Sequence, residues 1–329
     1  MRLELSHFRD TEQRYEHRRP AHSKRGGVKQ DKDSIHTMND LQIHWNNERM
    51  DSLLSGINNM RPIASTGFSN LDAIIGGWSQ GVSLISAPPA AGKSTWVLQS
   101  VDHVARFSNR RVIFVSCEMP SVSLIIKSIC RLSGEADTNA LSFGEVLNLS
   151  RKLTDVDNPR VRLLLSTIEA YTNEIAPQIA TLDDIQSVDD LFRLYETFPE
   201  DEPAPLCVVD YLQILRLQNA DALSDYQEVA RIMGSLCDLA KMHRIPVLAI
   251  ASQNRGKRNT ADFSALCGSS TLEYGANCVL FIEADEDELN QQDCRFVTLK
   301  VAKSKYSRIG SFDMQFYPSS SRFVEVMKP

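Results

Sequence analysis

The sequence lacks a long apolar run, a cysteine framework and a secretion signal, and each absence excludes a class of protein. No apolar stretch approaches the ~18 residues of a membrane span, and the opening MRLELSHFRD contains no hydrophobic signal segment. The seven cysteines include no C-x-x-C pair, and the seven histidines lack metal-ligand spacing. We therefore expect a cytoplasmic protein with reduced cysteines and no membrane partner, and not a zinc module or a disulfide-rich domain.

An excess of positive charge is also missing. The 329 residues carry 36 Lys and Arg against 42 Asp and Glu, which gives a formal net charge of −6. A nucleic-acid partner would therefore need a local basic patch, such as a loop or a pore lining. The length and the 42% hydrophobic content are sufficient for one large α/β domain with an appendage, or for two modest domains.

The most informative stretch that is present reads GVSLISAPPAAGKSTWVLQ, residues 81–99. An apolar run, a loop of small residues, Gly-Lys-Ser-Thr and a helical pattern follow one another, which is typical of a phosphate-binding loop. The backbone N–H groups of such a loop surround the phosphates, and the helix N-terminus adds positive potential. We predict that a nucleoside triphosphate is held by Ala87, Pro88, Pro89, Ala90, Ala91, Gly92, Lys93, Ser94 and Thr95.

Two side chains of this loop have predicted chemical roles. Lys93 is placed to reach the β- and γ-phosphates, and the Ser94 hydroxyl to ligate Mg2+. Ala87 occupies the position of the first glycine in the usual G-x-x-x-x-G-K-S pattern. If that position needs a positive φ, alanine costs conformational energy. The alternative interpretation is an ordinary strand–turn–helix unit that holds no nucleotide.

Three further apolar runs end in polar residues that would meet at one edge of a parallel sheet. VIFVSCE ends at Glu118, which we predict to orient and deprotonate the attacking water. LCVVD ends at Asp210, which we predict to contact the Mg2+ shell. IPVLAIAS is followed by Gln253, a predicted contact of the γ-phosphate. Each pattern alone also fits a solvated or turn-capping residue, and the upstream Gly-Lys-Ser favours the functional interpretation.

A basic cluster follows Gln253 directly. Arg255, Lys257 and Arg258 lie on a Gly-containing loop, where they either contact a nucleic-acid backbone or form a solvated charge cluster. We favour the nucleic-acid interpretation, because the loop continues from the predicted γ-phosphate contact.

A second basic cluster lies in the hairpin loop KSKYSRIGS near the C-terminus. Its members are Lys303, Lys305 and Arg308. They either complete the active site of a neighbouring subunit as cationic fingers, or they are surface charges that protect an edge hairpin from aggregation.

Helical and strand patterns alternate up to residue 283, and only strand patterns follow. This order predicts an α/β fold with a mostly parallel sheet, helices on both faces and an antiparallel C-terminal edge. The predicted helices span residues 122–132, 141–153, 187–198 and 226–243. The predicted strands after the phosphate loop span residues 112–115, 161–166, 206–210, 245–252, 277–283, 296–302, 312–316 and 323–326.

The polar, basic N-terminal region is predicted to differ from the rest. We expect residues 1–60 to form a tail or linker and residues 61–329 to form the ATPase domain. Within the tail, residues 33–59 show an imperfect helical stripe. This stripe either docks on a neighbouring subunit or packs on its own domain.

Several motifs, in this order, resemble the motor domain of DnaB-type replicative helicases: SAPPAAGKST, VSCEMP, VVDYLQIL, IPVLAIASQNR and VAKSKYSRIG. The resemblance covers residues 62–326. It implies a RecA-like P-loop NTPase core, a hexameric ring of identical subunits, ATP with Mg2+ bound between subunits, and single-stranded DNA as partner. It also implies the roles given above for the phosphate-site residues.

The sequence departs from that family pattern in informative places. Lys303 and Lys305 match the trans-acting Lys and Arg of the family, but Lys305 lacks the planar fork of an arginine. The segment from Gly268 to Glu273 differs from the usual acidic and Arg-containing pattern. The first 60 residues show no counterpart of the N-terminal domain that binds primase.

We expect a ring motor that hydrolyses ATP, moves on single-stranded DNA and unwinds duplex DNA, with other replication proteins as further partners. The alternative is a RecA-fold ATPase that assembles, loads or regulates another protein without unwinding. The weak basic balance and the missing N-terminal domain favour this alternative somewhat. The Glu-Met-Pro and Asp-Tyr-Leu-Gln motifs argue against a strand-exchange ATPase of the RecA group.

Overall fold

The computed structural model describes residues 61–137, 139–199, 201–217, 224–253, 269–284 and 293–326, with a few single positions besides. The ranges named here belong to the unit that runs from Leu54 to Pro329. They form one nine-stranded sheet in the order β3-β2-β4-β5-β1-β6-β7-β8-β9. The predicted boundary at residue 60, the segment 33–59 and the basic loop 255–258 lie outside or almost outside the described residues and stay predictions.

The parallel part of the sheet holds the strands that lead to the predicted site. They are β1 (Gly81–Ala87), β2 (Val112–Ser116), β3 (Ile179–Leu182), β4 (Leu206–Asp210), β5 (Pro246–Ser252) and β6 (Cys278–Glu283). β1 pairs in parallel with β5 and β6, and β4 pairs in parallel with β2 and β5. Central strands buried on both faces have continuous apolar runs, which explains the LCVVD and PVLAIAS patterns.

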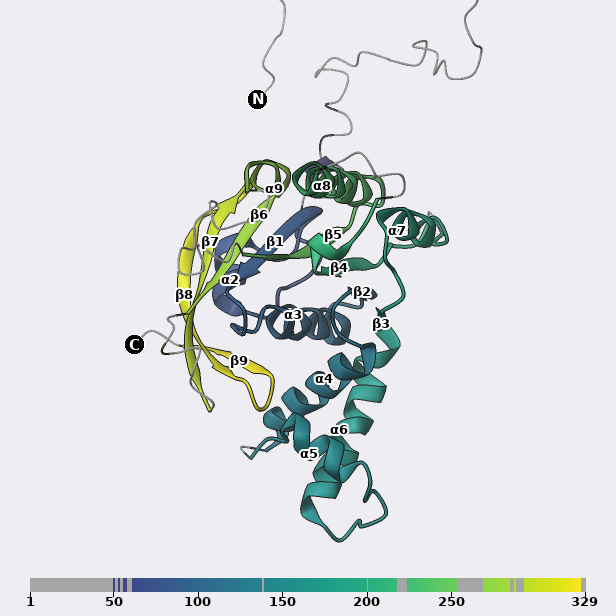
Figure 1. The fold of residues 1–329 in the computed structure, drawn as a ribbon, viewed down its shortest axis with the longest axis vertical. Coiled ribbons are helices and arrows are strands. Elements are labelled where there is room, and N and C mark those ends of the chain that lie inside the picture. The colour runs from purple at the N-terminus through teal and green to yellow at the C-terminus, as the bar shows by residue number, and fades with distance from the viewer. Residues whose placement is uncertain are drawn as a thin grey trace, which may run out of the picture. The chain divides into compact units, whose positions relative to one another are not determined.

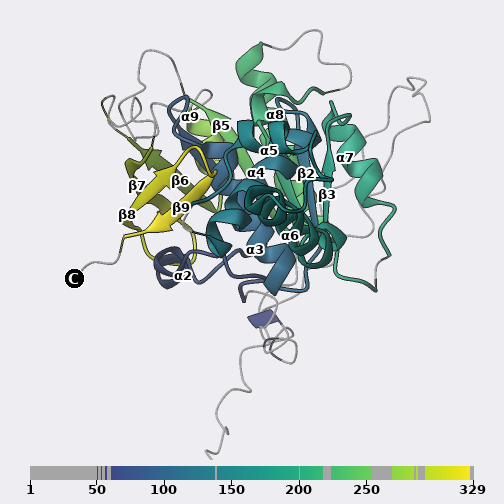
Figure 2. The ribbon, with the colours of Figure 1, turned by 90° about the horizontal axis from the view of Figure 1, so that it is seen from below.

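Helices cover both faces of this sheet, as predicted. α3 (Lys93–Phe107), α4 (Ser121–Ala136) and α6 (Pro159–Glu174) lie on one face, which Figure 2 shows toward the viewer. α7 (Val188–Tyr195), α8 (Asp225–Met242) and α9 (Ser269–Gly275) lie on the other face (Figure 1). The alternation along β5 divides its side chains between two cores: Leu248 and Ile250 pack toward α3, while Val247 and Ala249 pack toward α8.

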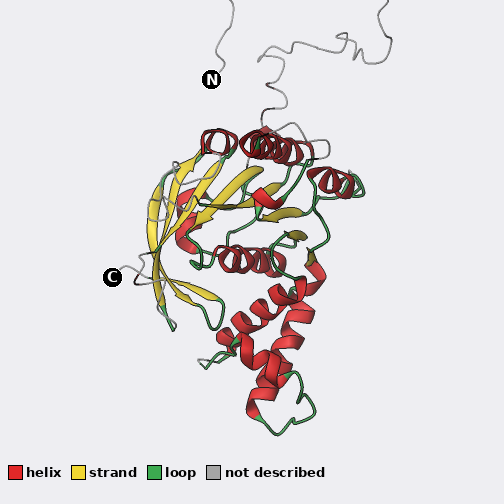
Figure 3. Ribbon diagram, in the orientation of Figure 1, coloured by secondary structure: helices red, strands yellow, loops and turns green. Residues whose placement is uncertain are grey.

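The sheet ends in antiparallel strands, which confirms the predicted C-terminal edge. β7 (Arg295–Ser304), β8 (Gly310–Tyr317) and β9 (Arg322–Glu325) follow β6 as hairpins. Figure 3 shows these strands continuing the yellow layer beyond the helices. The two smaller helices α2 (Ser69–Ile75) and α5 (Phe143–Leu149) complete the described elements together with the short 3-10 turns Ala176–Gln178 and Leu212–Ile214.

One predicted strand is wrong. Residues 161–166, VRLLLS, lie inside α6. The helix begins with Asn158, whose side chain accepts from Arg160 N–H, and Pro159 at its first position, a start signal that outweighs the leucine-rich run. Val161, Leu164 and Tyr171 are among its buried residues, at helical spacing. The edge strand β3 follows α6 and has no counterpart in the predictions.

None of the helices in the described ranges combines the length and the apolar character that crossing a bilayer requires.

Candidate nucleotide site

The predicted phosphate loop lies between β1 and α3. Two of its residues have left-handed backbone angles, Ala90 with φ 66° and Gly92 with φ 88°. A Cβ atom at Gly92 would lie 2.8 Å from Phe323 Cζ and 3.0 Å from Phe316 Cε1. Those two rings stack with their centroids 4.2 Å apart. Gly92 is therefore required both by its backbone conformation and by the aromatic pair beneath it.

The condition under which Ala87 would cost conformational energy, a positive φ, is not met. Ala87 is the fully buried last residue of β1, is paired with Ser252 of β5, and has no positive φ. The position of the missing glycine therefore accepts alanine. The residue that departs from ordinary L-residue geometry is Ala90, at a cost of about 1 kcal/mol.

A cavity of about 790 Å³ opens above this loop. It is bordered by the loop, by the tips of β2, β4 and β5, by α4 and by the C-terminal strands. The residues that line it are Pro89, Ala90, Gly92, Lys93, Ser94, Thr95, Glu118, Met119, Lys127, Asp210, Tyr211, Ser252, Gln253, Arg295, Phe316 and Pro318. The structure thus brings together the predicted phosphate, metal, water and γ-phosphate residues around one space.

Lys93 begins α3 and turns back toward the loop. Its Nζ donates to Ala87 O at 3.0 Å and to Pro88 O at 3.3 Å. Burial lowers the pKa of Lys93, while Asp210 and Glu118 act in the opposite direction. Its ammonium is held by neutral carbonyls that an anionic ligand can replace.

Asp210 is the most deeply buried carboxylate of the cavity, with 1% of its surface exposed. Burial raises the pKa of Asp210 to about 6, against a hydrogen bond from Ser94 and the positive charges of Lys93 and Lys127. Its Oδ2 has no hydrogen-bond partner. A buried, partly unsatisfied carboxylate beside a hydroxyl is an oxygen donor set that Mg2+ prefers.

No three His, Cys, Asp or Glu side chains form a metal-ligand cluster anywhere in the described part of the chain. Ser94 and Asp210 supply two protein oxygens, and Mg2+ at phosphate sites usually takes its other ligands from phosphate and water. The residues present therefore fit a magnesium ion that is completed by its nucleotide.

Glu118 and Gln253 follow β2 and β5, the two strands that flank β4 in the sheet. Ser116 pairs with Asp210, and Cys117 N–H donates to Asp210 O at 2.7 Å, so Glu118 follows directly beside the buried carboxylate. Glu118 is exposed at the cavity. Gln253 is 8% exposed, and its Oε1 is buried without a partner.

Two basic residues of the cavity have no counterpart in the predictions. Lys127 reaches in from α4, and its Nζ donates to Thr95 Oγ1 at 3.2 Å. Arg295, at the start of β7, donates to Ala90 O at 2.7 Å and lies over the Phe316 ring. Neither residue belongs to a local motif. The available signal for Lys127 was a lysine within a helical pattern that begins shortly after Glu118.

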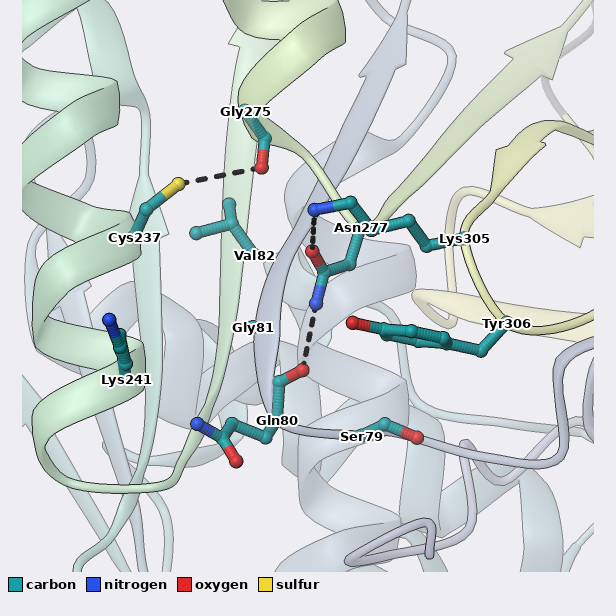
Figure 4. Close-up of a pocket in the computed structure, with 10 residues that line it drawn as sticks. All are labelled: Ser79, Gln80, Gly81, Val82, Cys237, Lys241, Gly275, Asn277, Lys305 and Tyr306. Carbon is teal, nitrogen blue, oxygen red and sulfur yellow. Dashed lines mark hydrogen bonds between the residues drawn. The ribbon is translucent and has the colours of Figure 1, made fainter. Parts of the chain in front are cut away.

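The predicted fingers are not part of this cavity. Lys303 Nζ donates to Glu273 O, Lys305 Nζ to Asn277 Oδ1 at 3.2 Å, and Arg308 to Ala73 O at 2.9 Å. Lys305 lines a second cavity of about 310 Å³ at the start of β1 (Figure 4). The phosphate loop follows the other end of that strand, roughly 20 Å away at ~3.3 Å per residue.

Comparison with known families identifies the domain that carries this site. Residues 64–325 match the model of the DnaB-like helicase C-terminal domain. The chain belongs to the DnaB-like helicase C-terminal domain family. The predicted resemblance to the DnaB-type motor domain is therefore confirmed.

Curated members of this family are distant in sequence. The chain is 28% identical over 267 residues to the replicative DNA helicase DnaB of Pasteurella multocida (strain Pm70), covering 79% of this chain and 54% of that relative. It is 24% identical over 270 residues to the replicative DNA helicase DnaB of Geobacillus stearothermophilus, covering 79% of this chain and 56% of the relative. The chain thus spans about half the length of the curated relatives it matches.

Solved structures show the same fold. One solved ATPase domain has a TM-score of 0.72 at 20% identity, covering 87% of this chain and 100% of that one. A DnaB-like replicative helicase, studied with its primase interactions, has a TM-score of 0.69 at 21% identity, covering 84% of this chain and 66% of that one. The predicted RecA-like core is confirmed by these neighbours.

Proposed function

We propose that this chain is an ATP-hydrolysing motor that assembles into a ring, moves on single-stranded DNA and unwinds duplex DNA. The observation that supports this most directly is the convergence of Lys93, Ser94, Glu118, Asp210 and Gln253 on one cavity. Four separate strands bring these groups to the same edge of the sheet, and the chain belongs to a helicase domain family.

Binding of the triphosphate would use the loop and two ammonium groups. The backbone N–H groups of the loop and the start of α3 would surround the phosphates. Lys93 would exchange its two carbonyl partners for phosphate oxygens, and Lys127 would approach from α4. Ser94 and Asp210 would hold Mg2+, which neutralises charge on the phosphates when bound.

The two carboxylates would have different roles because their surroundings differ. Asp210 is buried and contacts Ser94, which suits a residue of the metal shell. Glu118 is exposed at the cavity, where water has access, and would orient the attacking water and accept its proton. Gln253 has an unpartnered Oε1 and an amide N–H for the γ-phosphate region.

The hairpin cations would act on a second copy of the chain. Lys305 lies at the far end of β1, and none of Lys303, Lys305 and Arg308 lines the nucleotide cavity of its own chain. In a ring, this end of one subunit would face the phosphate loop of the next and add positive charge to the transition state. On this basis we propose a homo-oligomeric ring. The DNA contact at Arg255, Lys257 and Arg258 is proposed from the sequence alone, because these residues lie outside the described part of the chain.

ATP turnover and strand separation test the proposal. We would measure both with and without single-stranded DNA for the wild type, Lys93→Ala, and the triple variant Arg255→Ala/Lys257→Ala/Arg258→Ala. Lys93→Ala should lose turnover, and the triple variant should lose DNA stimulation but keep basal turnover. The control is Arg151→Ala/Lys152→Ala, two exposed residues away from the cavity.

Two outcomes would contradict the proposal in different ways. Full turnover by Lys93→Ala would remove the assigned active site. Turnover without DNA binding, stimulation or unwinding would favour the alternative, an assembly or loading ATPase.

A further inference from the structure

Asn277 connects the start of β6 to the start of β1. Its backbone N–H donates to Val82 O at 2.7 Å, and its side-chain Nδ2 donates to Gln80 O at 2.9 Å. Figure 4 shows the side chain lying between β1 and the hairpin that carries Lys305. Asn277 is thus fixed to the strand that leads to the phosphate loop.

The same residue also holds Lys305. Lys305 N–H donates to Asn277 O at 2.8 Å, and Lys305 Nζ donates to Asn277 Oδ1 at 3.2 Å. An asparagine amide offers one acceptor and two donors, so one side chain serves the lysine and β1 at the same time. Neither an aliphatic residue nor a carboxylate can make both of these side-chain bonds.

The backbone beside Asn277 is built to admit it. Gly81, the first residue of β1, has φ +116°, and a Cβ atom there would lie 1.9 Å from Asn277 Nδ2. A side chain at position 81 would therefore displace the amide from its place. The glycine provides both the backbone conformation and the space that this contact requires.

The cavity leaves Lys305 open to a partner. Besides Lys305 it is lined by Lys241, Tyr306, Cys237 and Gly275, and Tyr306 is 65% exposed. Lys241 and Lys305 make this opening positively charged, which suits the phosphates of a nucleotide bound to another copy of the chain.

We propose that Asn277 is a positioning residue that aims the Lys305 ammonium at the nucleotide of a neighbouring subunit and couples it to the subunit's own β1. This proposal rests on the ring function proposed above. The coupling follows a short covalent and hydrogen-bonded route: Lys305 to Asn277, Asn277 to the start of β1, and the end of β1 to the phosphate loop. Because β1 is hydrogen-bonded to a strand on each side, a displacement of Lys305 would be transmitted along β1 to the phosphate loop.

A double-mutant cycle on ATP turnover tests this. The variants are Lys305→Ala, Asn277→Ala, the double variant, and the control Asn173→Ala, an exposed residue of α6. We expect Lys305→Ala to lower kcat roughly 100-fold or more, because a trans-acting cation contributes mainly in the transition state. Asn277→Ala should lower kcat roughly 5- to 30-fold without raising KM to the same extent.

The double variant gives the decisive value. If Asn277 acts through Lys305, the double variant should match Lys305→Ala within about twofold. If instead the kcat of the double variant is reduced by the product of the two single fold losses, Asn277 acts independently of Lys305 and the proposal is overturned. Full turnover by Lys305→Ala would instead contradict the finger assignment of the proposed function.

A second substitution guards against loss of folding. Asn277→Asp keeps the size of the side chain and an acceptor for Lys305, but it removes the donor to Gln80 O. Thermal unfolding is measured for every variant, and the cycle is repeated with Asn277→Asp. We again expect the double variant to have the kcat of Lys305→Ala. If the fold losses in kcat of Asn277→Asp and Lys305→Ala multiply in the double variant, the proposal is also overturned.

Discussion

Burial controls the charged residues around the phosphate loop. Asp210 and Lys127 both lie in the cavity, and burial raises the pKa of the carboxyl and lowers the pKa of the ammonium. Each group is therefore held in a state that is unfavourable without a ligand. Bound Mg2+ and phosphate would offset the desolvation of these two charged groups, so binding at this site would raise the free energy of unfolding.

We expect Asp210→Asn to stabilise the metal-free, nucleotide-free protein at pH 7.5. Burial raises the pKa of Asp210 to about 6 in the folded protein. The folded state therefore binds the proton more tightly than the unfolded state, and this contribution to the free energy of unfolding is fully present below the ordinary pKa of an aspartate and is lost as the pH rises through 6. Asparagine removes the buried charge, and the free energy of unfolding should rise by about 1–3 kcal/mol at pH 7.5. Urea unfolding in EDTA measures it.

The gain for Asp210→Asn should shrink toward pH 4.5, where the wild-type carboxyl is protonated. If Asp210→Asn is less stable than the wild type at both pH values, burial of the charged carboxylate does not destabilise the folded protein. ATP turnover should be lost at either pH.

Lys127→Met should weaken ATP binding roughly 3- to 10-fold, because it removes an ammonium group from the cavity at a cost of ~1 kcal/mol while keeping the side-chain length. Titration with a fluorescent ATP analogue measures the dissociation constant. Lys152→Met, at an exposed position outside the cavity, is the matched control. Unchanged affinity for Lys127→Met would remove this lysine from the site.

Single residues were predictable where a motif fixes both chemistry and position. Lys93, Ser94 and Asp210 belong to such motifs. Lys127 and Arg295 do not, because they enter the cavity from a helix face and a strand start that only tertiary packing brings near the loop. The motif alone could not decide whether Ala87 needs a positive φ, and the strand shows that it does not.

At the scale of elements, the helices behind the loop are joined by a buried ion pair. Arg131 of α4 pairs with Asp102 of α3, and Ser128 Oγ donates to Asp102 Oδ2 at 2.5 Å. Both charged side chains are 3% exposed. This contact fixes α4, and with it Lys127, relative to the helix that begins at Lys93.

Arg131→Met should lower the free energy of unfolding by about 3 kcal/mol, because it leaves the buried carboxylate of Asp102 without its cation. Chemical denaturation measures this. Asp102→Leu/Arg131→Met removes both charges and should recover most of the loss. If the single variant is as stable as the wild type, the pair does not hold these helices together.

Element types were predictable where the apolar period was clear, as for β4 and α8. Residues 161–166 were misassigned because three consecutive leucines hide the helical period that Val161, Leu164 and Tyr171 follow. The edge strand β3 was missed since it is short and only partly buried, so its sequence lacks a buried-strand pattern.

At the scale of the whole molecule, the sequence order predicted a parallel sheet with an antiparallel edge but not which strands would be neighbours. The order β2-β4-β5-β1 brings Glu118, Asp210, Gln253 and the phosphate loop to one edge. The hairpin with Lys305 lies at the other end of these strands, beside the start of β1. A single chain therefore carries the phosphate cavity and the predicted fingers at separate ends of the strands, as the proposed sharing of a site between copies requires.

Mixing two inactive variants tests this account most directly. Glu118→Gln subunits lack the proposed proton acceptor for water but keep Lys305. Lys305→Ala subunits keep an intact cavity but lack the proposed finger. Each variant alone should be nearly inactive with ATP and single-stranded DNA. Mixed rings should regain part of the turnover, because some interfaces then join an intact cavity to an intact Lys305. Mixtures that stay as inactive as the separate variants, although they assemble together, would contradict a site shared between neighbouring copies.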